Sequence, residues 1–167
     1  MMASLPDVGS VPVLVDRLRP GHAGEALTVQ YAAFLSEGRL YGTFAIPPLV
    51  ETVDQLAADL ERPGTRGWAA WIGPRLVGSV RLLGVDGPGP VGFARCSVAP
   101  DLQGRGIGTA LIEAAHASLA PGVESALVTG DRSAGNLALY ARHGYVESGR
   151  EFDSAGVAVV RMRRVAP

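Results

Sequence analysis

The chain has 167 residues, 47% of them hydrophobic and 19% charged, which predicts one compact domain with a sizeable core and excludes a chain that is disordered throughout. Its 15 basic and 16 acidic residues give a formal net charge of -1, so it lacks the positive field with which proteins bind nucleic acids or anionic membranes. The longest stretches without a charged residue have 11 residues, at 26–36 and 40–50, whereas a membrane-spanning helix needs about 20 apolar residues. We therefore expect neither a nucleic-acid partner nor a membrane partner.

The residue types that the chain lacks exclude further classes of site. All 15 basic residues are arginine, which excludes Schiff-base chemistry and the lysine of a P-loop nucleotide site. Cys96 is the only cysteine and the three histidines are scattered, so we expect no disulfide, no metal site and a reducing, cytoplasmic location. We expect residues 1–10 to be a flexible leader without a secretory signal and residues 11–167 to form a single domain.

Hydrophobic periodicity predicts the elements of the first third of the chain. Alternating β-branched residues at 11–18 predict a strand. Apolar residues then recur at helical spacing within 27–35 and 53–60, which predicts two short helices, the second begun by a capping box at 52–55. The Ile-Pro-Pro segment at 46–48 is expected to be extended or turned, because each proline restrains itself and its predecessor.

Strand-like runs and turn signals alternate in the rest of the chain. Glycine and proline turns separate three of these runs and predict an antiparallel meander, at 67–72, 76–85 and 91–98. The elements predicted after it are a helix at 107–119, a strand at 125–129, a helix at 134–142 and a terminal strand pair at 145–150 and 157–165. The third strand of the meander therefore runs through a glycine-rich turn directly into a helix.

This glycine-rich turn is the most informative segment of the sequence. Gly104, Gly106 and Gly108 let a ligand approach the backbone closely, and the first amides of the following helix then point at the ligand with the positive end of the helix dipole behind them. That arrangement suits a phosphate group. Thr109 stands where a dinucleotide-binding fingerprint would have its third glycine, and the absence of lysine excludes a Walker loop.

Two motifs resemble those of the GNAT superfamily of acyl-CoA-dependent N-acyltransferases. The first is the signature of Gln or Arg, two residues, Gly, one residue, and Gly or Ala, placed between a strand and a helix, which is matched by Gln103, Gly106 and Gly108. The second is the downstream segment 136–145, with Asn136, Tyr140 and a Gly-Tyr pair. The resemblance extends over about residues 76–165. It implies a mixed α/β fold, with a twisted, mostly antiparallel sheet, a splayed central parallel strand pair and helices on both faces.

The same resemblance implies the residues that bind acetyl-CoA. Backbone groups of Cys96, Ser97 and Val98 would pair with the pantetheine arm. Asn136 would touch this arm, and Tyr140 would lie near the thioester sulfur as the general acid. The amides of the loop would hold the pyrophosphate, and these belong to Gln103, Gly104, Arg105, Gly106, Ile107, Gly108 and Thr109.

No general base can be named from the sequence. Some members of the superfamily carry a glutamate on the central strand where this chain has Gly92. Glu37, Glu51 and Asp131 are candidates, but each also suits a structural place at a helix end, in a first helical turn or in a turn. An amine that arrives partly neutral needs no dedicated base.

The remaining residues of chemical interest favour structural roles. A lone Cys96 within a strand favours packing and backbone contact over nucleophilic catalysis. We expect His116 and His143 to be surface histidines.

We expect direct transfer of the acetyl group of acetyl-CoA to a primary amine of a small molecule or peptide, within a ternary complex. The alternatives are a module that binds or senses acyl-CoA without catalysis, and an acyltransferase for a longer acyl-CoA or a protein N-terminus. A homodimer formed through a sheet edge near residues 157–160 is a further possibility.

Overall fold

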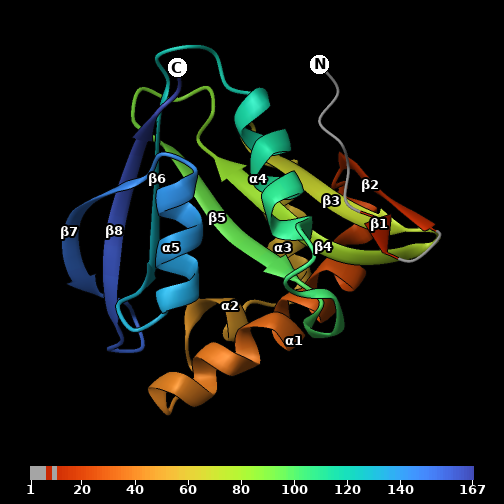
Figure 1. The fold of residues 1–167 in the computed structure, drawn as a ribbon, viewed down its shortest axis with the longest axis horizontal. Helices are drawn as coiled ribbons and strands as arrows, with labels where there is room; N and C mark the ends of the chain where they lie inside the picture. Colours follow the sequence, from red (N-terminus) through yellow and green to blue (C-terminus); the bar gives the residue numbers. More distant parts are fainter. Residues whose placement is uncertain (1–6, 9–10) are drawn as a thin grey trace.

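One mixed sheet forms the centre of the computed structural model, which describes residues 7–8 and 11–167 (Figure 1). Its strands are β1 (Asp7–Val8), β2 (Val11–Arg17), β3 (Arg66–Ile72), β4 (Arg75–Leu83), β5 (Val91–Val98), β6 (Glu124–Gly130), β7 (Val146–Phe152) and β8 (Ala158–Val165). The helices are α1 (Ala23–Tyr41), α2 (Pro47–Val50), α3 (Val53–Glu61), α4 (Ile107–Ala117) and α5 (Ala134–Arg142), with single 3-10 turns η1 (Pro20–His22) and η2 (Pro100–Leu102). From β2 onward these elements follow the predicted order of strands and helices, with α2 as one additional short helix.

The strand order is β1-β2-β3-β4-β5-β6-β8-β7. Within the described residues, β5 and β6 form the one parallel pair, and it has only two rungs, Val91 with Ser125 and Gly92 with Ala126. The neighbouring pairs β3–β4, β4–β5, β6–β8 and β7–β8 are antiparallel. The predicted mostly antiparallel sheet with a central parallel pair is therefore confirmed, and past their two rungs β5 and β6 no longer pair.

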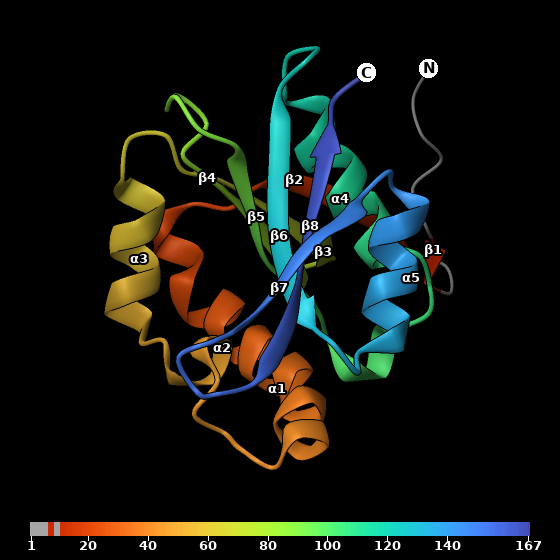
Figure 2. The same ribbon diagram turned by 90° about the vertical axis from the view of Figure 1, so that its left-hand side faces the viewer.

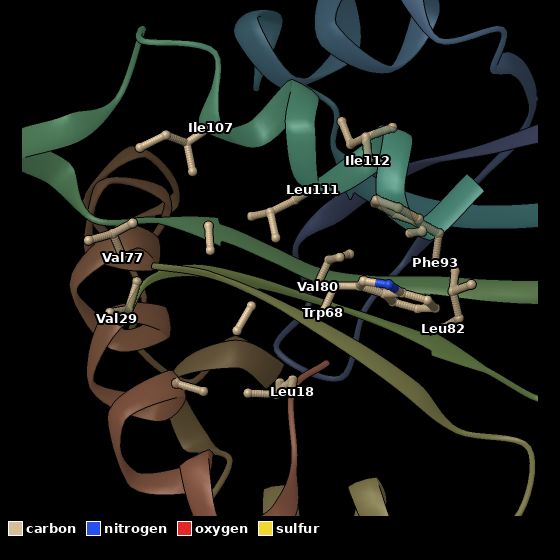
Figure 3. Close-up of a cluster of buried hydrophobic side chains, with 14 of the residues drawn as sticks. Leu18, Val29, Trp68, Val77, Val80, Leu82, Phe93, Ile107, Leu111 and Ile112 are labelled. Carbon is tan, nitrogen blue, oxygen red and sulfur yellow. The ribbon is translucent and has the colours of Figure 1, made fainter. Parts of the chain in front are cut away.

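Helices cover both faces of this sheet. Figure 2 shows α3 and α5 on opposite sides of it, and Figure 3 shows α4 and α1 on opposite sides of the central strands. The apolar face of α4 is fully buried, with Ile107, Leu111 and Ile112 at most 1% exposed, and it packs on strand residues such as Val80 and Leu82. The apolar side of this helix is thus the side that faces the core.

The first two helical regions differ from the prediction. Helix α1 has 19 residues and is not short. Its buried positions include Ala26, Gln30 and Gly38, which are small or polar and so carry no hydrophobic periodicity. The expectation of an extended or turned segment holds for Ile46 (φ -61°, ψ 146°) but is wrong for the two prolines, which begin α2. A proline fits the first helical position, where its missing N–H would have no partner.

The boundaries of the predicted leader are only partly described. Residues 7 and 8 form β1, in which Asp7 pairs with Pro12 and Val8 with Val11 of β2. The rest of the prediction for residues 1–10 lies outside the described residues.

The predicted capping box at the start of α3 is confirmed, since Thr52 Oγ1 accepts a hydrogen bond from the Gln55 backbone N–H and the Gln55 side chain accepts one from the Thr52 backbone N–H.

We predict that Gly78→Ala destabilises the fold and that Gly24→Ala does not. A Cβ at Gly78 would lie 2.8 Å from the Ser97 carbonyl oxygen and 3.0 Å from a methyl group of Leu111, whereas a Cβ at Gly24 in α1 has no neighbour within 4 Å. Overpacking of this kind costs about 1–3 kcal/mol, while alanine in an exposed helix gains about 0.5–1 kcal/mol. Urea unfolding of both variants measures the difference, and equal stabilities would contradict the prediction.

Candidate functional site

A cleft of about 690 Å³ opens where β5 and β6 part. Its walls are the second half of β5, the turn before α4, the first turn of α4, one side of α5 along its length, the end of α1, α2 and parts of β6 and β8. Eleven of the twelve predicted site residues line it, namely Cys96, Ser97, Val98, Gln103, Gly104, Gly106, Ile107, Gly108, Thr109, Asn136 and Tyr140. Arg105 is exposed and is not among the lining residues. Two sequence segments predicted to act together are therefore brought to one cleft.

The turn before α4 presents free backbone donors to this cleft. Gly104 (φ 75°) and Gly106 (φ 83°) adopt the left-handed conformation that glycine enters without a steric penalty. The first backbone hydrogen bond of α4 runs from the Ala110 N–H to the Gly106 carbonyl, so the N–H groups of residues 107–109 have no partner within the helix. The Gln103 side chain donates a hydrogen bond of 3.1 Å to the Val98 carbonyl and so ties this turn to the end of β5.

A bulge changes the course of β5 at the cleft. Ser79 of β4 pairs with Ser97 and Arg81 pairs with Ala94, so that the two residues Arg95 and Cys96 face one residue of β4. Arg95 has φ 57° and is the one non-glycine residue with positive φ in the described chain. The edge of β5 beyond Gly92 has no strand partner on the β6 side, which leaves its backbone groups open toward the cleft.

Tyr140 is buried in an aromatic environment beside the cleft. Its ring packs edge-on against Phe93, with centroids 5.8 Å apart, and against Tyr145 at 5.9 Å. Burial, with lesser effects from Cys96, Tyr145 and Glu37, raises the pKa of Tyr140 well above 10. The phenol is therefore protonated at neutral pH and available as a hydrogen-bond or proton donor.

Cys96 lines the same cleft as a thiol. Burial raises the pKa of Cys96 to about 12, so the thiolate that a nucleophilic mechanism requires is not populated at neutral pH.

The three candidate bases have different surroundings. Glu37 lines the cleft, where its carboxylate accepts hydrogen bonds from Ser133 Oγ at 2.6 Å and Asn136 Nδ2 at 3.4 Å. Glu51 instead forms a two-fold ion pair with Arg81 at 2.7 and 2.9 Å, and its pKa is lowered by hydrogen bonds from its neighbours despite burial, which acts in the opposite direction. Glu51 and Asp131 are not among the lining residues. Glu37 is thus the candidate that the fold places in the cleft.

The sequence signature of the acetyltransferase (GNAT) domain matches residues 41–166, which include the whole cleft apart from α1. The chain belongs to the GNAT acetyltransferase family. The resemblance found in its two motifs is therefore confirmed.

Solved structures show the same GNAT fold. The ribosomal-protein-S18-alanine N-acetyltransferase from Escherichia coli has 17% identity and a TM-score of 0.73, with 92% of this chain and 94% of that chain covered. A GCN5-related N-acetyltransferase from Rhodopseudomonas palustris has 21% identity and a TM-score of 0.72 over 99% and 98% of the two chains. The PaiA N-acetyltransferase from Thermoplasma acidophilum, crystallised with coenzyme A, has 13% identity and a TM-score of 0.68 over 92% and 98%. No curated protein is significantly similar in sequence to this chain.

The GNAT chain holds its cleft together through contacts that the sequence did not predict. The Tyr41 hydroxyl accepts a hydrogen bond of 2.8 Å from the Arg132 backbone, and the Arg132 guanidinium lies 4.6 Å from the Tyr41 ring centroid. Together with the bond between Ser133 and Glu37, these contacts join the end of α1 to the turn before α5. Phe34, Arg95 and Asp153 also line the cleft without a motif to mark them.

The histidines of this GNAT domain are more buried than predicted. His116 is half-buried, lies 5.7 Å from the Phe93 ring and hydrogen-bonds the Tyr145 hydroxyl at 3.0 Å. His143 is also half-buried and donates from Nδ1 to the Leu139 carbonyl. The expectation of two surface histidines is wrong, because the two rings lie 6.5 Å apart and His116 also packs beside Phe93 and Tyr145. In the part of the chain that the structure describes, no helix has both the length and the apolar character to cross a membrane.

We predict that His116→Gln flattens the dependence of stability on pH. Burial, and then the charges of Arg164 and His143, lower the pKa of His116 from 6.5 to about 4. The unfolded chain therefore takes up a proton that the folded chain does not, and stability is lost as the pH falls from about 6.5 toward 4. Urea unfolding between pH 7.5 and 4.5 should show a steeper decline for the wild type than for the variant. Parallel curves would contradict this assignment.

Proposed function

We propose that this chain transfers the acetyl group of acetyl-CoA to a primary amine within a ternary complex. The observation that carries the proposal is the cleft itself, because one cavity combines free helix amides, an unpaired strand edge and a protonated phenol. Because acetyl-CoA is an intracellular metabolite, we propose a cytoplasmic location.

The residues of the cleft fit acetyl-CoA. The free N–H groups of residues 107–109 and the α4 dipole favour a pyrophosphate at this point. A Cβ at Gly108 would meet no protein atom closer than 3.8 Å, so the glycine leaves space that the protein does not fill. The open edge of β5 at residues 96–98 can pair with the amide groups of a pantetheine arm, and Asn136 lies on the facing helix α5. A bound acetyl-CoA supplies the activated thioester.

Tyr140 is proposed as the general acid. Collapse of the adduct between amine and thioester expels a thiolate, and a proton donor close to the sulfur makes this step easier. The Tyr140 hydroxyl lines the cleft, and no hydrogen-bond partner for it is found among the described residues, so it is free to donate a proton. Bulk solvent then reprotonates the phenol.

The acceptor amine must lose a proton before or during attack. Glu37 can accept this proton directly or through water, since it lines the cleft and affects the pKa of Tyr140. An amine that enters the buried cleft as the neutral base needs no such help. Among the structural neighbours, the names record an alanine of a ribosomal protein as one acceptor and coenzyme A as a bound ligand, which supports an amine acceptor and the cofactor without fixing the substrate.

Thermal unfolding with acetyl-CoA tests the cofactor site. Acetyl-CoA at 100 times its Kd should stabilise the fold by about 2.7 kcal/mol, which raises Tm by roughly 5–10 °C for a chain of this size. In Gly108→Val the added side chain should leave the unliganded fold intact but occupy ligand space, so the shift should shrink. Gly24→Ala, outside the cleft, is the matched control and should keep the full shift. No shift in the wild type at millimolar acetyl-CoA would refute the cofactor assignment.

Substitution of Tyr140 tests its role as the general acid. Tyr140→Phe should lower kcat for thiol release by about a hundredfold, which is typical of the loss of a general acid, while the thermal shift with acetyl-CoA stays. Tyr145→Phe is the control, because the Tyr145 hydroxyl is bound by Ser125 and His116 and does not line the cleft. Unchanged turnover in Tyr140→Phe would remove the proposed role.

The same assay separates the alternatives. A thermal shift with acetyl-CoA without thiol release for any amine would favour a non-catalytic binding module, and faster release from a longer acyl-CoA would favour a different acyl group.

A further inference from the structure

We propose that Arg95 binds a carboxylate group of the acceptor, so that the substrates are primary amines that also carry a carboxylate. This inference rests on the proposed acetyl transfer and names its substrate class. The combination that carries it is a half-buried guanidinium, exposed to the cleft at the β5 bulge, whose nitrogens hydrogen-bond none of the described residues.

The backbone places Arg95 in the cleft at a steric cost. A residue other than glycine in the left-handed region is unusual, and strain of this kind is found where the surroundings impose it, often at ligand sites. The bulge puts Arg95 directly before Cys96, Ser97 and Val98, the residues proposed to pair with the pantetheine arm. A group bound to Arg95 would therefore lie beside the reacting end of the cofactor and not beside its phosphates.

The guanidinium of Arg95 has unused hydrogen-bonding capacity. Its Nε is fully buried and has no hydrogen-bond partner among the described residues. The nearest carboxylate oxygen belongs to Glu51 at 3.7 Å, which is beyond hydrogen-bond distance. The two terminal nitrogens also make no hydrogen bond within the described chain, and they are not fully covered by protein. The side chain as a whole is 28% exposed, so these nitrogens are the part a ligand can reach.

Glu51 does not hydrogen-bond Arg95, because its carboxylate is oriented toward Arg81 and Gln30 and its Oε2 stays 3.7 Å from Arg95 Nε. Arg81, 3% exposed, donates to both oxygens of Glu51, and Gln30 donates to Oε2 at 2.8 Å. Arg81 also binds Asp59 at 2.8 Å. The two carboxylates are thus arranged around Arg81. Arg95 shares Glu51 with Arg81 through a looser ion pair at 3.7 Å, and its terminal nitrogens keep free donors at the cleft wall.

The other charged residues of the cleft support an acceptor that carries both charges. Besides Arg95, the charged side chains that line the cleft are the carboxylates of Glu37 and Asp153 and the exposed guanidinium of Arg142 on α5. Asp153 Oδ1 is held by the amides of Ala155 and Val157. A carboxylate on Arg95 and an ammonium near the acidic side chains would complement this arrangement. A polyamine would bring only positive charges, and the half-buried Arg95 guanidinium would repel any of them that came beside it.

Pairs of L-amino acids and the corresponding L-amino acid amides test the proposal. Each pair offers the same side chain and a primary amine with and without the carboxylate, and thiol release from acetyl-CoA gives kcat/KM for both. The kcat/KM for the acid divided by that for the amide is then compared between wild type and Arg95→Gln, so that the different basicity of the two amines cancels. Loss of a charge-assisted hydrogen bond should lower this ratio by about tenfold to a hundredfold. Arg95→Lys, which keeps the charge, should retain part of it.

Each result has a defined meaning. An equal ratio in wild type and Arg95→Gln, or a loss confined to the KM of acetyl-CoA, would overturn the proposal. If Arg95→Gln does not fold, the proposal is tested with Arg95→Lys and with the wild type. It is overturned if, after correction for amine basicity, the wild type prefers no amino acid over the corresponding amide. If no amine supports thiol release, the proposed transfer has failed, and binding of the same pairs in the presence of coenzyme A tests Arg95 separately. Acid-selective binding that Arg95→Gln abolishes would support the carboxylate site.

Discussion

The site depends on one constraint of the sheet, which is that β5 and β6 pair over two rungs and then diverge. Backbone groups that leave a sheet ladder must find water, another segment or a ligand as partners, and in this fold the open edge of β5 faces a cleft and not a neighbouring strand. The free amides at the start of α4 open into the same space. The end of α1 closes the cleft from another side through Tyr41 and Glu37, which bind the turn before α5. Ligand recognition by backbone groups therefore follows from topology.

A second buried feature determines where the wall formed by α1, α2 and α3 lies. Arg81 on β4 binds Glu51 after α2, Asp59 on α3 and Gln30 on α1. Taking such charges out of water costs much of what their attraction returns, so a cluster of this kind is weak support for stability but fixes the relative positions of the elements that carry it. Removal of Arg81 would leave two carboxylates without their main partner, whereas Arg95 lies at the edge of the cluster and pairs with Glu51 only at 3.7 Å.

The sequence predicted the fold more completely than the site. The strands and helices from residue 66 onward follow apolar periodicity and glycine-proline turns, and the spacing of Gln103, Gly106 and Gly108 identified the turn that we propose to bind phosphate. The second half of α1 was missed, because its contacts with the cleft are made by Glu37 and Tyr41 and its packing uses Gly38, none of which gives an apolar repeat. The importance of Arg95 depends on a bulge that no local sequence pattern marks. The burial of His116 arises from packing against Phe93 on β5 and against Tyr145 and His143 after α5, which lie more than 20 residues away in the sequence.

The absence of a glutamate at Gly92 is less of a problem for acetyl transfer than the sequence suggested. The burial that raises the pKa of Tyr140 and of Cys96 disfavours charge in this part of the cleft, and the same effect lowers the pKa of an amine that enters it. In the proposed reaction, desolvation would thus keep the acid protonated and shift the acceptor toward its neutral, nucleophilic form. A carboxylate held by Arg95 would orient such an amine. It would not cancel the lowering of the amine pKa, because the guanidinium is itself a cation and favours loss of the ammonium proton nearby. A site with no carboxylate on its central strand can therefore still prepare both reactants, with burial taking the place of a dedicated base.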